Sequence, residues 1–303
     1  MDVLVVGDAN PDLVLRGDVR PRFGQAEQLL TGADLVLGGS AAITAAGCAR
    51  LGLRTTLLTA LGDDVFGAVT RGALEERGVS LLLADAAPGT PTGLSVILSP
   101  ADQDRAILTL PGTIPTLRPQ DVTDAHLAAT RHVHVASLYL QPGLAAGLAG
   151  VFARARAAGV GTSLDTNWDP AGKWESIADI LAYTDVFLPN ANELRAVTGE
   201  SDLDAAAAML TATGTTVVMK NGAAGARAWG PDGGCSAPGR TVDVVDTTGA
   251  GDSFNAGFLA ARLVGRPLAE AIAWAAAAGS LSTRAAGGTA AQATREELSP
   301  SGR

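Results

Sequence analysis

Charged and aromatic residues are both scarce in this chain of 303 residues. Charged side chains make up 17% of the sequence and aromatic side chains 4%, whereas 47% of the residues are hydrophobic and glycine occurs 37 times. This composition predicts a core of Leu, Val and Ala on closely packed helices. The 22 basic residues are outnumbered by 31 acidic residues. That balance argues against nucleic acid as a partner, because phosphate backbones demand clustered Lys and Arg.

Cysteine is almost absent, with Cys48 and Cys235 as the two examples. They predict neither a disulfide framework nor a metal site, and the three histidines show no metal-ligand spacing. No apolar run free of charge and glycine is long enough to cross a bilayer, so we expect no membrane partner. Residues 1–7 lack a basic stretch and enter a strand-like run at once, from which we expect no secretory signal and a cytoplasmic protein.

Short apolar runs alternate with helical segments along most of the chain. Strands are expected at residues 3–6, 55–58, 132–135, 161–164, 186–188, 217–219 and 241–245. Helices are expected at residues 41–50, 65–76, 144–158, 193–197, 203–212, 253–264 and 268–283. Such alternation predicts an α/β fold with a mostly parallel sheet and helices on both of its faces.

Two regions break this rhythm. In residues 13–37, polar and apolar residues are interleaved, with no helical pattern between the strand-like pieces. In residues 92–110, two β-rich runs flank the tetrapeptide at 99–102, Ser-Pro-Ala-Asp, which is typical of a hairpin. We expect both regions to form a small second sheet that projects from the main body. Because no long linker interrupts the sequence, residues 1–303 are expected to form one domain.

The run VDTTGAGDSF at residues 245–254 is the most informative stretch of the chain. Three small residues, Gly249, Ala250 and Gly251, stand where a helix is expected to begin. Unpaired backbone N–H groups at a helix N-terminus attract anions, and glycines let a phosphate approach the backbone closely. Asp252 follows at once and can accept the proton of an attacking hydroxyl, although a carboxylate there also complements the helix dipole. The arrangement suits phosphoryl transfer.

Residues 246–254 resemble the C-terminal motif of the ribokinase-like (PfkB) family of sugar kinases, whose pattern is D-T-x-G-A-G-D-x-F. Five further segments resemble motifs of this family: residues 7–12, 38–42, 61–67, 189–194 and 220–225. The resemblance implies a three-layer α/β/α ribokinase-like fold with a mostly parallel central sheet and a small β-sheet lid. It also implies ATP and Mg²⁺ as cofactors and a homodimer that joins through the lid.

By this resemblance Asp252 is the catalytic base, and the backbone of residues 249–251 stabilises charge on the transferred phosphoryl group. Besides Asp252, substrate binding is assigned to Asn10, Asp12, Gly38 and Gly39. Asn167 is a further candidate for substrate binding, because it follows an expected strand at the carboxyl edge, where α/β folds bind ligands. ATP binding is assigned to Asn190, Lys220, Gly222, Gly225, Gly251 and Ala276.

Two ion sites follow from the same comparison. Mg²⁺ prefers oxygen ligands and keeps several waters, which Asn190 and Glu193 are expected to hold. A capping box at the start of a helix explains the spacing of these two residues equally well. The resemblance also implies a monovalent-cation site, with K⁺ as the candidate ion, at five residues: Asp246, Thr248, Ser282, Ala285 and Gly287.

Ile43 departs from the family pattern, which usually carries Asn at this place, and an apolar side chain cannot donate to a sugar hydroxyl.

The main hypothesis is an ATP-dependent kinase that phosphorylates a hydroxymethyl group of an unphosphorylated sugar or sugar-like substrate. Ile43 leaves open a nucleoside kinase. A catalytically silent sugar or nucleotide sensor is disfavoured by the presence of Asp252. A kinase of sugar phosphates is disfavoured because no cluster of Arg and Lys stands beside Asp12 or Gly38 in the sequence.

Overall fold

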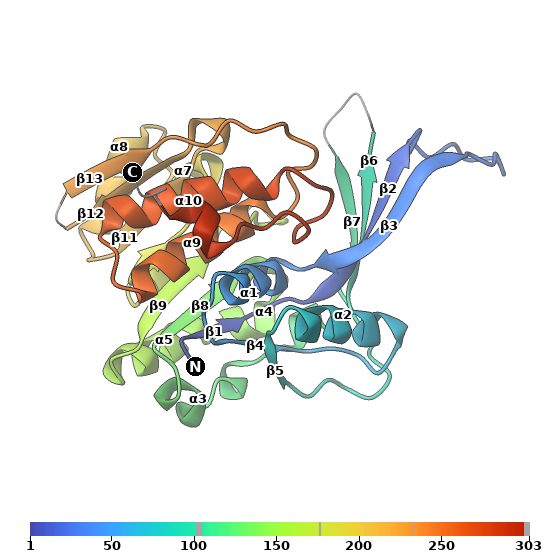
Figure 1. Cartoon of the computed structure of the whole chain (residues 1–303). Helices are drawn as coiled ribbons and strands as arrows, with labels where there is room; N and C mark the ends of the chain where they lie inside the picture. The colour runs from blue at the N-terminus through green and yellow to red at the C-terminus, as the bar shows by residue number, and fades with distance from the viewer. Residues whose placement is uncertain (101–104, 176, 232, 300–303) are drawn as a thin grey trace.

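A nine-stranded sheet forms the centre of the fold, and a four-stranded sheet projects beside it (Figure 1). The computed structural model describes residues 1–100, 105–175, 177–231 and 233–299. Along the large sheet the strands are β13 (Gly233–Ala237), β12 (Ala226–Gly230), β11 (Thr216–Lys220), β10 (Val186–Phe187), β9 (Gly161–Asp165), β8 (His132–Ala136), β1 (Val3–Val6), β4 (Thr55–Thr59) and β5 (Ser80–Leu83).

The large sheet is parallel over most of its width, which confirms the prediction. Neighbouring strands from β11 to β5 pair in parallel, and β12 pairs antiparallel with both β11 and β13. The helices are α1 (Ser40–Arg50), α2 (Val65–Glu76), α3 (Asp124–Ala128), α4 (Pro142–Ala145), α5 (Leu148–Ala157), α6 (Ile177–Leu181), α7 (Ala191–Thr198), α8 (Leu203–Thr211), α9 (Ala250–Leu263), α10 (Leu268–Ser282) and α11 (Arg295–Leu298). Among the described residues, no helix combines the length and the hydrophobicity that a membrane span requires.

Alternate side chains of β1 enter two different hydrophobic cores. Val3 and Val5 pack in a core with residues of α1, α9 and α10, whereas Leu4 and Val6 pack with residues of α5 and α6. All four side chains are fully buried, because successive residues of a strand point to opposite faces of its sheet and both faces are covered. The predicted three-layer α/β/α fold is therefore confirmed.

The small sheet has the order β3-β2-β6-β7. Its strands are β2 (Asn10–Gly17), β3 (Leu30–Gly38), β6 (Leu94–Ser99) and β7 (Ala106–Leu110). Both irregular regions of the sequence contribute to this sheet, and β6 and β7 pair antiparallel as the predicted hairpin requires. Residues 101 and 102 of its predicted turn lie outside the described residues. Since β2 begins four residues after β1 ends, the small sheet grows directly from the carboxyl edge of the large one.

The strand predicted at residues 241–245 is wrong. This segment belongs to no strand and has a bend at Val245, and the backbone N–H groups of Val245 and Asp246 both donate to the carbonyl of Thr283, at 2.8 and 3.1 Å. Val244 and Val245 are 62% and 64% exposed. The sheet ends instead in the β12–β13 hairpin, whose small residues hide the apolar alternation that marks a strand.

The helix predicted at residues 144–158 is two helices, α4 and α5, separated near Gly147. A Cβ atom at Gly147 would lie 2.5 Å from the Cγ atom of Pro119, so a side chain there would clash with the proline ring. The apolar periodicity continues across this break, which is why the sequence predicts one helix.

Two histidines on β8 share one serine inside the protein. The Nε2 atom of His132 and the Nδ1 atom of His134 each lie 2.8 Å from the Ser163 hydroxyl oxygen. Burial lowers the pKa of His132 to about 4 and that of His134 to about 3. Both imidazoles are therefore neutral in the folded protein at pH 5, where an unfolded histidine is mostly protonated.

We expect His134→Gln to destabilise the protein most at neutral pH. In the native state His134 stays neutral, whereas in the unfolded state it binds a proton as pH falls below 6.5. This proton binding stabilises the unfolded state of the wild type, and it is absent in the variant because glutamine cannot titrate. The difference in free energy of unfolding between wild type and variant should therefore be about 2 kcal/mol smaller at pH 5 than at pH 7.5. Urea denaturation at both pH values measures it. Thr184→Val, which removes a buried hydroxyl bonded to the Ile180 carbonyl, is the non-titrating control. Equal differences at both pH values would contradict the prediction.

Candidate active site

The predicted phosphate-binding motif lies at the N-terminus of α9. Gly249 precedes this helix with a left-handed φ of +69°, and a Cβ atom there would lie 2.6 Å from the Cα atom of Gly288. A residue with a side chain would be strained and would clash at this position. Asp252 lies in the first turn of α9 and is buried. The helix start predicted from the small residues is therefore present, although the strand expected before it is not.

The Asp252 carboxylate meets the N-terminus of α1. The Ser40 hydroxyl donates a hydrogen bond to Asp252 Oδ1, and the same hydroxyl lies 3.3 Å from Asn167 Oδ1. Burial raises the pKa of Asp252 to about 7, and the negative charge of Asp165 acts in the same direction. The Ser40 hydrogen bond and the Lys220 charge oppose this shift. A carboxylate that titrates near neutral pH is suited to general base catalysis.

Asp165, which is buried, and Lys220, whose side chain is 14% exposed, form an ion pair between the ends of β9 and β11. Lys220 Nζ donates to Asp165 Oδ2 at 2.5 Å, and the Asn255 side-chain amide donates to the same oxygen at 2.6 Å. The Asn167 N–H donates to Asp165 Oδ1 at 3.2 Å. Burial alone would raise the pKa of Asp165, but the Lys220 charge and these hydrogen bonds hold it below its usual range. Lys220 thus lies among the carboxylates of the site.

The predicted sugar residues lie together where β2 and β3 leave the main body. Asn10 is paired with Gly38 in the antiparallel register, and the Asn10 side-chain amide donates to Asp12 Oδ1 at 3.0 Å. A Cβ atom on Gly38 would overlap the Asp12 carboxylate, so glycine is required there by Asp12 itself. Gly39, with φ of +84°, turns the chain from β3 into α1. Burial and the Asp8 charge raise the pKa of Asp12 to about 7.

Asp8 is a site residue that the sequence reasoning missed. Its two carboxylate oxygens accept hydrogen bonds from the backbone N–H groups of Ser40 and Ala41, each at 3.0 Å. A carboxylate that lies more than thirty positions away therefore caps the N-terminus of α1. Burial raises the pKa of Asp8 despite these bonds. The signal available in the sequence is an acidic residue directly after β1, at the carboxyl edge where ligands bind.

A cavity of about 470 Å³ lies at the N-terminus of α9, where Ala250 and Gly251 line it. Five of the six predicted ATP residues line it: Lys220, Gly222, Gly225, Gly251 and Ala276. Thr241, Val242 and Val244, from the segment wrongly predicted as a strand, form part of its wall. The cavity combines an apolar wall with glycine backbone and a helix N-terminus, a lining that suits a nucleotide and its phosphates.

Asn190 and Glu193 form a capping box at the start of α7. Asn190 Oδ1 accepts hydrogen bonds from the N–H groups of Asn192 and Glu193, and Glu193 Oε2 accepts one from the Asn190 N–H at 2.8 Å. The capping box, which was the alternative explanation of the spacing of Asn190 and Glu193, is thus present. Burial and the Asp165 charge raise the pKa of Glu193 to about 7. No cluster of three or more His, Cys, Asp or Glu that could hold a metal occurs in the ranges that the structure describes.

Asp246 connects the segment before α9 with the loop after α10. Its Oδ1 atom accepts hydrogen bonds from the N–H and hydroxyl of Thr248, both at 2.8 Å, and its Oδ2 atom accepts one from the Gly287 N–H at 2.9 Å. The Ser282 hydroxyl donates to the carbonyl of Gly279. Three of the five residues of the predicted cation site are therefore bonded to one another, namely Asp246, Thr248 and Gly287; Ala285 lies two residues before Gly287 in the same loop.

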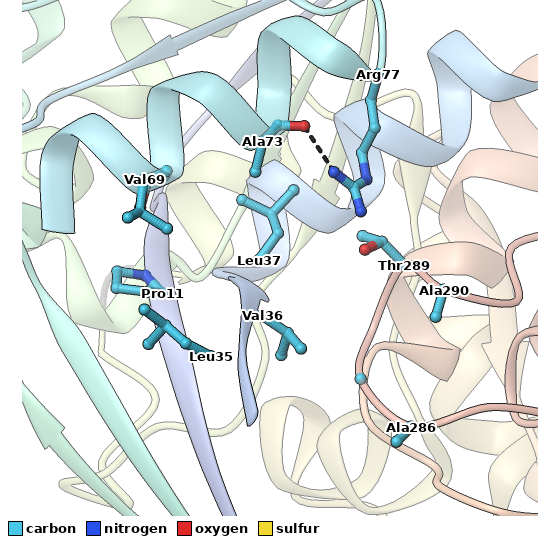
Figure 2. Close-up of a pocket in the computed structure, with 12 residues that line it drawn as sticks. Pro11, Leu35, Val36, Leu37, Val69, Ala73, Arg77, Ala286, Thr289 and Ala290 are labelled. Atoms are coloured by element: carbon cyan, nitrogen blue, oxygen red, sulfur yellow. Dashed lines mark hydrogen bonds between the residues drawn. The ribbon is translucent and has the colours of Figure 1, made fainter. Parts of the chain in front are cut away.

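A second cavity, of about 180 Å³, lies between β3, α2 and residues 286–290 (Figure 2). Its wall is mostly apolar, and Figure 2 shows Arg77 at one side, where the guanidinium donates to the carbonyl of Ala73 at 2.8 Å. Of the predicted site residues, Gly287 lines this cavity. None of its described lining residues also lines the larger cavity, so the two spaces are separate.

Ile43 packs between the two loops that meet at the α9 N-terminus. Cβ atoms placed on Gly249 and Gly288 would lie 3.1 and 2.5 Å from Ile43 methyl groups, and the side chain is buried. Its apolar character thus serves packing against backbone.

An aromatic cluster beside Asn167 was also missed. The ring of Trp174 makes edge-on contacts with Trp168 and Tyr139, with centroids 5.2 and 5.3 Å apart. Asn167 and Trp174 both have left-handed φ values, +52° and +53°, which are rare for residues with side chains and cluster at functional sites. The signal in the sequence is the pair of tryptophans shortly after β9, in a chain with four.

Known proteins resemble this chain over nearly its whole length. The sequence profile of the pfkB family carbohydrate kinases matches residues 1–295. An ATP-dependent ribose-1-phosphate kinase from Halopiger xanaduensis is 32% identical over 285 residues, covering 92% of this chain and 90% of that protein. A fructokinase from Klebsiella pneumoniae is 32% identical over 314 residues, covering 98% and 97%. The structure of Arabidopsis thaliana ribokinase with ribose and ATP has a TM-score of 0.86 at 25% identity, covering 98% and 97%.

We expect Lys220→Met to lower the free energy of unfolding by about 3–5 kcal/mol, because the buried Asp165 carboxylate loses its charged partner. Adding Asp165→Asn should recover part of this loss, because no unpaired charge then remains at the pair. Urea denaturation of both single variants and of the double variant provides the cycle. Lys173→Met is the matched control, since Lys173 is the other lysine of the chain and is exposed. A loss of unfolding free energy in the double variant equal to the sum of the losses in the two single variants would contradict the prediction.

Proposed function

The chain belongs to the PfkB family of carbohydrate kinases, and we propose that it transfers the γ-phosphoryl group of ATP to a hydroxymethyl group of an unphosphorylated sugar or sugar-like substrate. The observation that carries the proposal is the place of Asp252. Its carboxylate lies in the first turn of α9, with the nucleotide-sized cavity beside Gly251 and the Asn10, Asp12 and Gly38 group on adjoining elements.

In the proposed reaction Asp252 orients the acceptor hydroxyl and receives its proton. A bond forms between the acceptor oxygen and the γ-phosphorus while the bond from this phosphorus to the β,γ-bridging oxygen breaks, and ADP leaves. The N–H groups at the start of α9 stabilise charge on the transferred group. Asp12 binds sugar hydroxyls through a carboxylate oxygen, and Asn10 holds that carboxylate in place.

Ions complete the proposed site. Mg²⁺ would arrive with ATP and neutralise phosphate charge, and Asn190 and Glu193 are proposed to hold its waters. The capping box uses one oxygen of the Glu193 carboxylate, so the other is available for this role. K⁺ is proposed to bind at Asp246, Thr248, Ser282, Ala285 and Gly287, mostly through backbone carbonyls. We also propose that the enzyme works in the cytoplasm, since the reaction consumes ATP.

The small sheet is proposed to act as a lid that excludes water from the transfer. Arg105, directly before β7, donates to the Thr247 hydroxyl at 2.7 Å, so the sheet already contacts the segment before α9. Burial raises the pKa of Asp12, and the positive charge of Arg105 partly opposes this rise. In the sequence no cluster of Arg and Lys stands beside Asp12 or Gly38, which supports an unphosphorylated acceptor.

A substrate panel tests the proposed function. ADP release from Mg·ATP should occur with at least one free hexose or pentose, and the panel should include sugar phosphates and nucleosides as competing acceptors. Asp252→Asn should then lower kcat by roughly 10²- to 10⁴-fold with little change in thermal stability, because the general base is lost. Asp204→Asn, at an exposed carboxylate bonded to Arg227 and Trp229, is the control. Near-normal turnover of Asp252→Asn would contradict the mechanism, and silence across the panel would favour a sensor.

A homodimer through the lid is the proposed assembly. β7 is an edge strand on which all five residues are exposed, including Ile107, Leu108 and Leu110 at 50% or more, and an exposed apolar edge is normally covered. We expect a dimer in sedimentation velocity and a shift toward monomer for Leu108→Lys. Met209→Lys alters an exposed apolar residue on α8 and should leave the dimer intact. A monomeric wild type at high concentration would contradict the assembly.

A further inference from the structure

Ser40 occupies a fixed position at the junction of β3 and α1. Gly39 turns the chain there, and the Ser40 N–H donates to the Asp8 carboxylate at 3.0 Å. The residue is 7% exposed. Because its backbone is bonded and its surroundings are packed, its hydroxyl has few directions available to it. Ser40 lies in the motif segment at residues 38–42, but the sequence assigns a role there to Gly38 and Gly39 and none to the serine.

The hydroxyl of Ser40 points at the proposed catalytic base. It donates to Asp252 Oδ1 and lies 3.3 Å from Asn167 Oδ1. Within the part of the chain that the structure describes, this is the one side-chain hydrogen bond to the Asp252 carboxylate. The second oxygen, Oδ2, is therefore the one left to meet an acceptor hydroxyl. A carboxylate bonded through one oxygen is also restricted in rotation about its last side-chain bond.

We propose that Ser40 is a positioning residue for Asp252, whose hydroxyl fixes one carboxylate oxygen, turns the other toward the acceptor and keeps the carboxylate ionised. This role rests on the proposed kinase function, in which Asp252 acts as the base. A hydrogen bond donated to a carboxylate stabilises its charged form. The serine would thus set both the orientation of the base and the pH at which it works.

The charges around Asp252 make this donor important. Burial raises the pKa of Asp252, and the carboxylates of Asp165 on β9 and Asp8 after β1 raise it further. The Ser40 hydroxyl and the Lys220 ammonium lower it. Lys220 donates its hydrogen bond to Asp165, whereas Ser40 donates directly to the Asp252 carboxylate.

The pH profile of the reaction tests the proposal. In Ser40→Ala the acidic midpoint of kcat/KM should move up by about one pH unit, because a hydrogen bond to a charged group is lost. At pH 7 this shift alone corresponds to about a fivefold loss of rate, which should largely disappear at pH 9. Ser40→Thr retains the hydroxyl and should return the midpoint toward wild type. A rate lowered equally at every pH, with an unmoved midpoint, would overturn the proposal.

Thr44→Val is the matched control on the same helix. The Thr44 hydroxyl lies 3.4 Å from the backbone carbonyl of Asp252, not from its carboxylate, so its removal should leave the midpoint in place. A midpoint that moves equally in both variants would show that packing, not the Ser40 hydrogen bond, is responsible. If Ser40→Ala fails to fold in thermal denaturation, Ser40→Cys keeps a weak donor of similar size and should give an intermediate midpoint.

A direct titration separates this proposal from the proposed function. Protein labelled with ¹³C at the aspartate carboxyl carbons allows the Asp252 signal to be assigned by its loss in Asp252→Asn. Its titration midpoint should rise by about one unit in Ser40→Ala, whether or not any sugar of the panel is phosphorylated. An unchanged midpoint overturns the role of Ser40, even in an active kinase. An inactive wild type with a shifted midpoint overturns the kinase function and leaves the contact established.

Discussion

Carboxylates buried at the carboxyl edge of the central sheet must be compensated inside the protein, and the site is organised around that requirement. The desolvation of a carboxylate is costly unless a positive charge or hydrogen-bond donors replace water. Lys220 compensates Asp165, the N-terminus of α1 compensates Asp8, and the Ser40 hydroxyl partly compensates Asp252. Compensation is incomplete at Asp252, which leaves the pKa of this carboxyl near neutrality.

The two sheets bring the proposed donor and acceptor to one place from different sides. The small sheet carries Asp12 out from the end of β1, whereas the cavity proposed to bind ATP lies against α10 and the residues after β11. The N-termini of α1 and α9 meet between them, and the Ser40–Asp252 hydrogen bond joins the two helices. A helix N-terminus attracts negative charge, so a phosphoryl group moving across this junction would stay near favourable dipoles.

Local sequence predicted the elements well where periodicity was undisturbed, and poorly where backbone contacts took over. The apolar run at 241–245 resembles a strand, yet its end is bonded to the carbonyl of Thr283 and its start lines the larger cavity. Ile43 looked like a missing sugar contact, but the structure places it against Gly249 and Gly288. The spacing of Asn190 suited either a metal or a cap, and the cap is present.

What the sequence by itself determined is the alternation of strands and helices, the small residues at the start of α9 and the carboxylate that follows them, because these depend on neighbours a few residues apart. The tertiary structure alone decided which side chains touch. Ser40 and Asp252 are 212 positions apart, and Lys220 and Asp165 are 55 apart. Burial and the nearest charge set a pKa, and neither exists until distant segments pack. The chemistry of Asp252 is therefore a property of the fold.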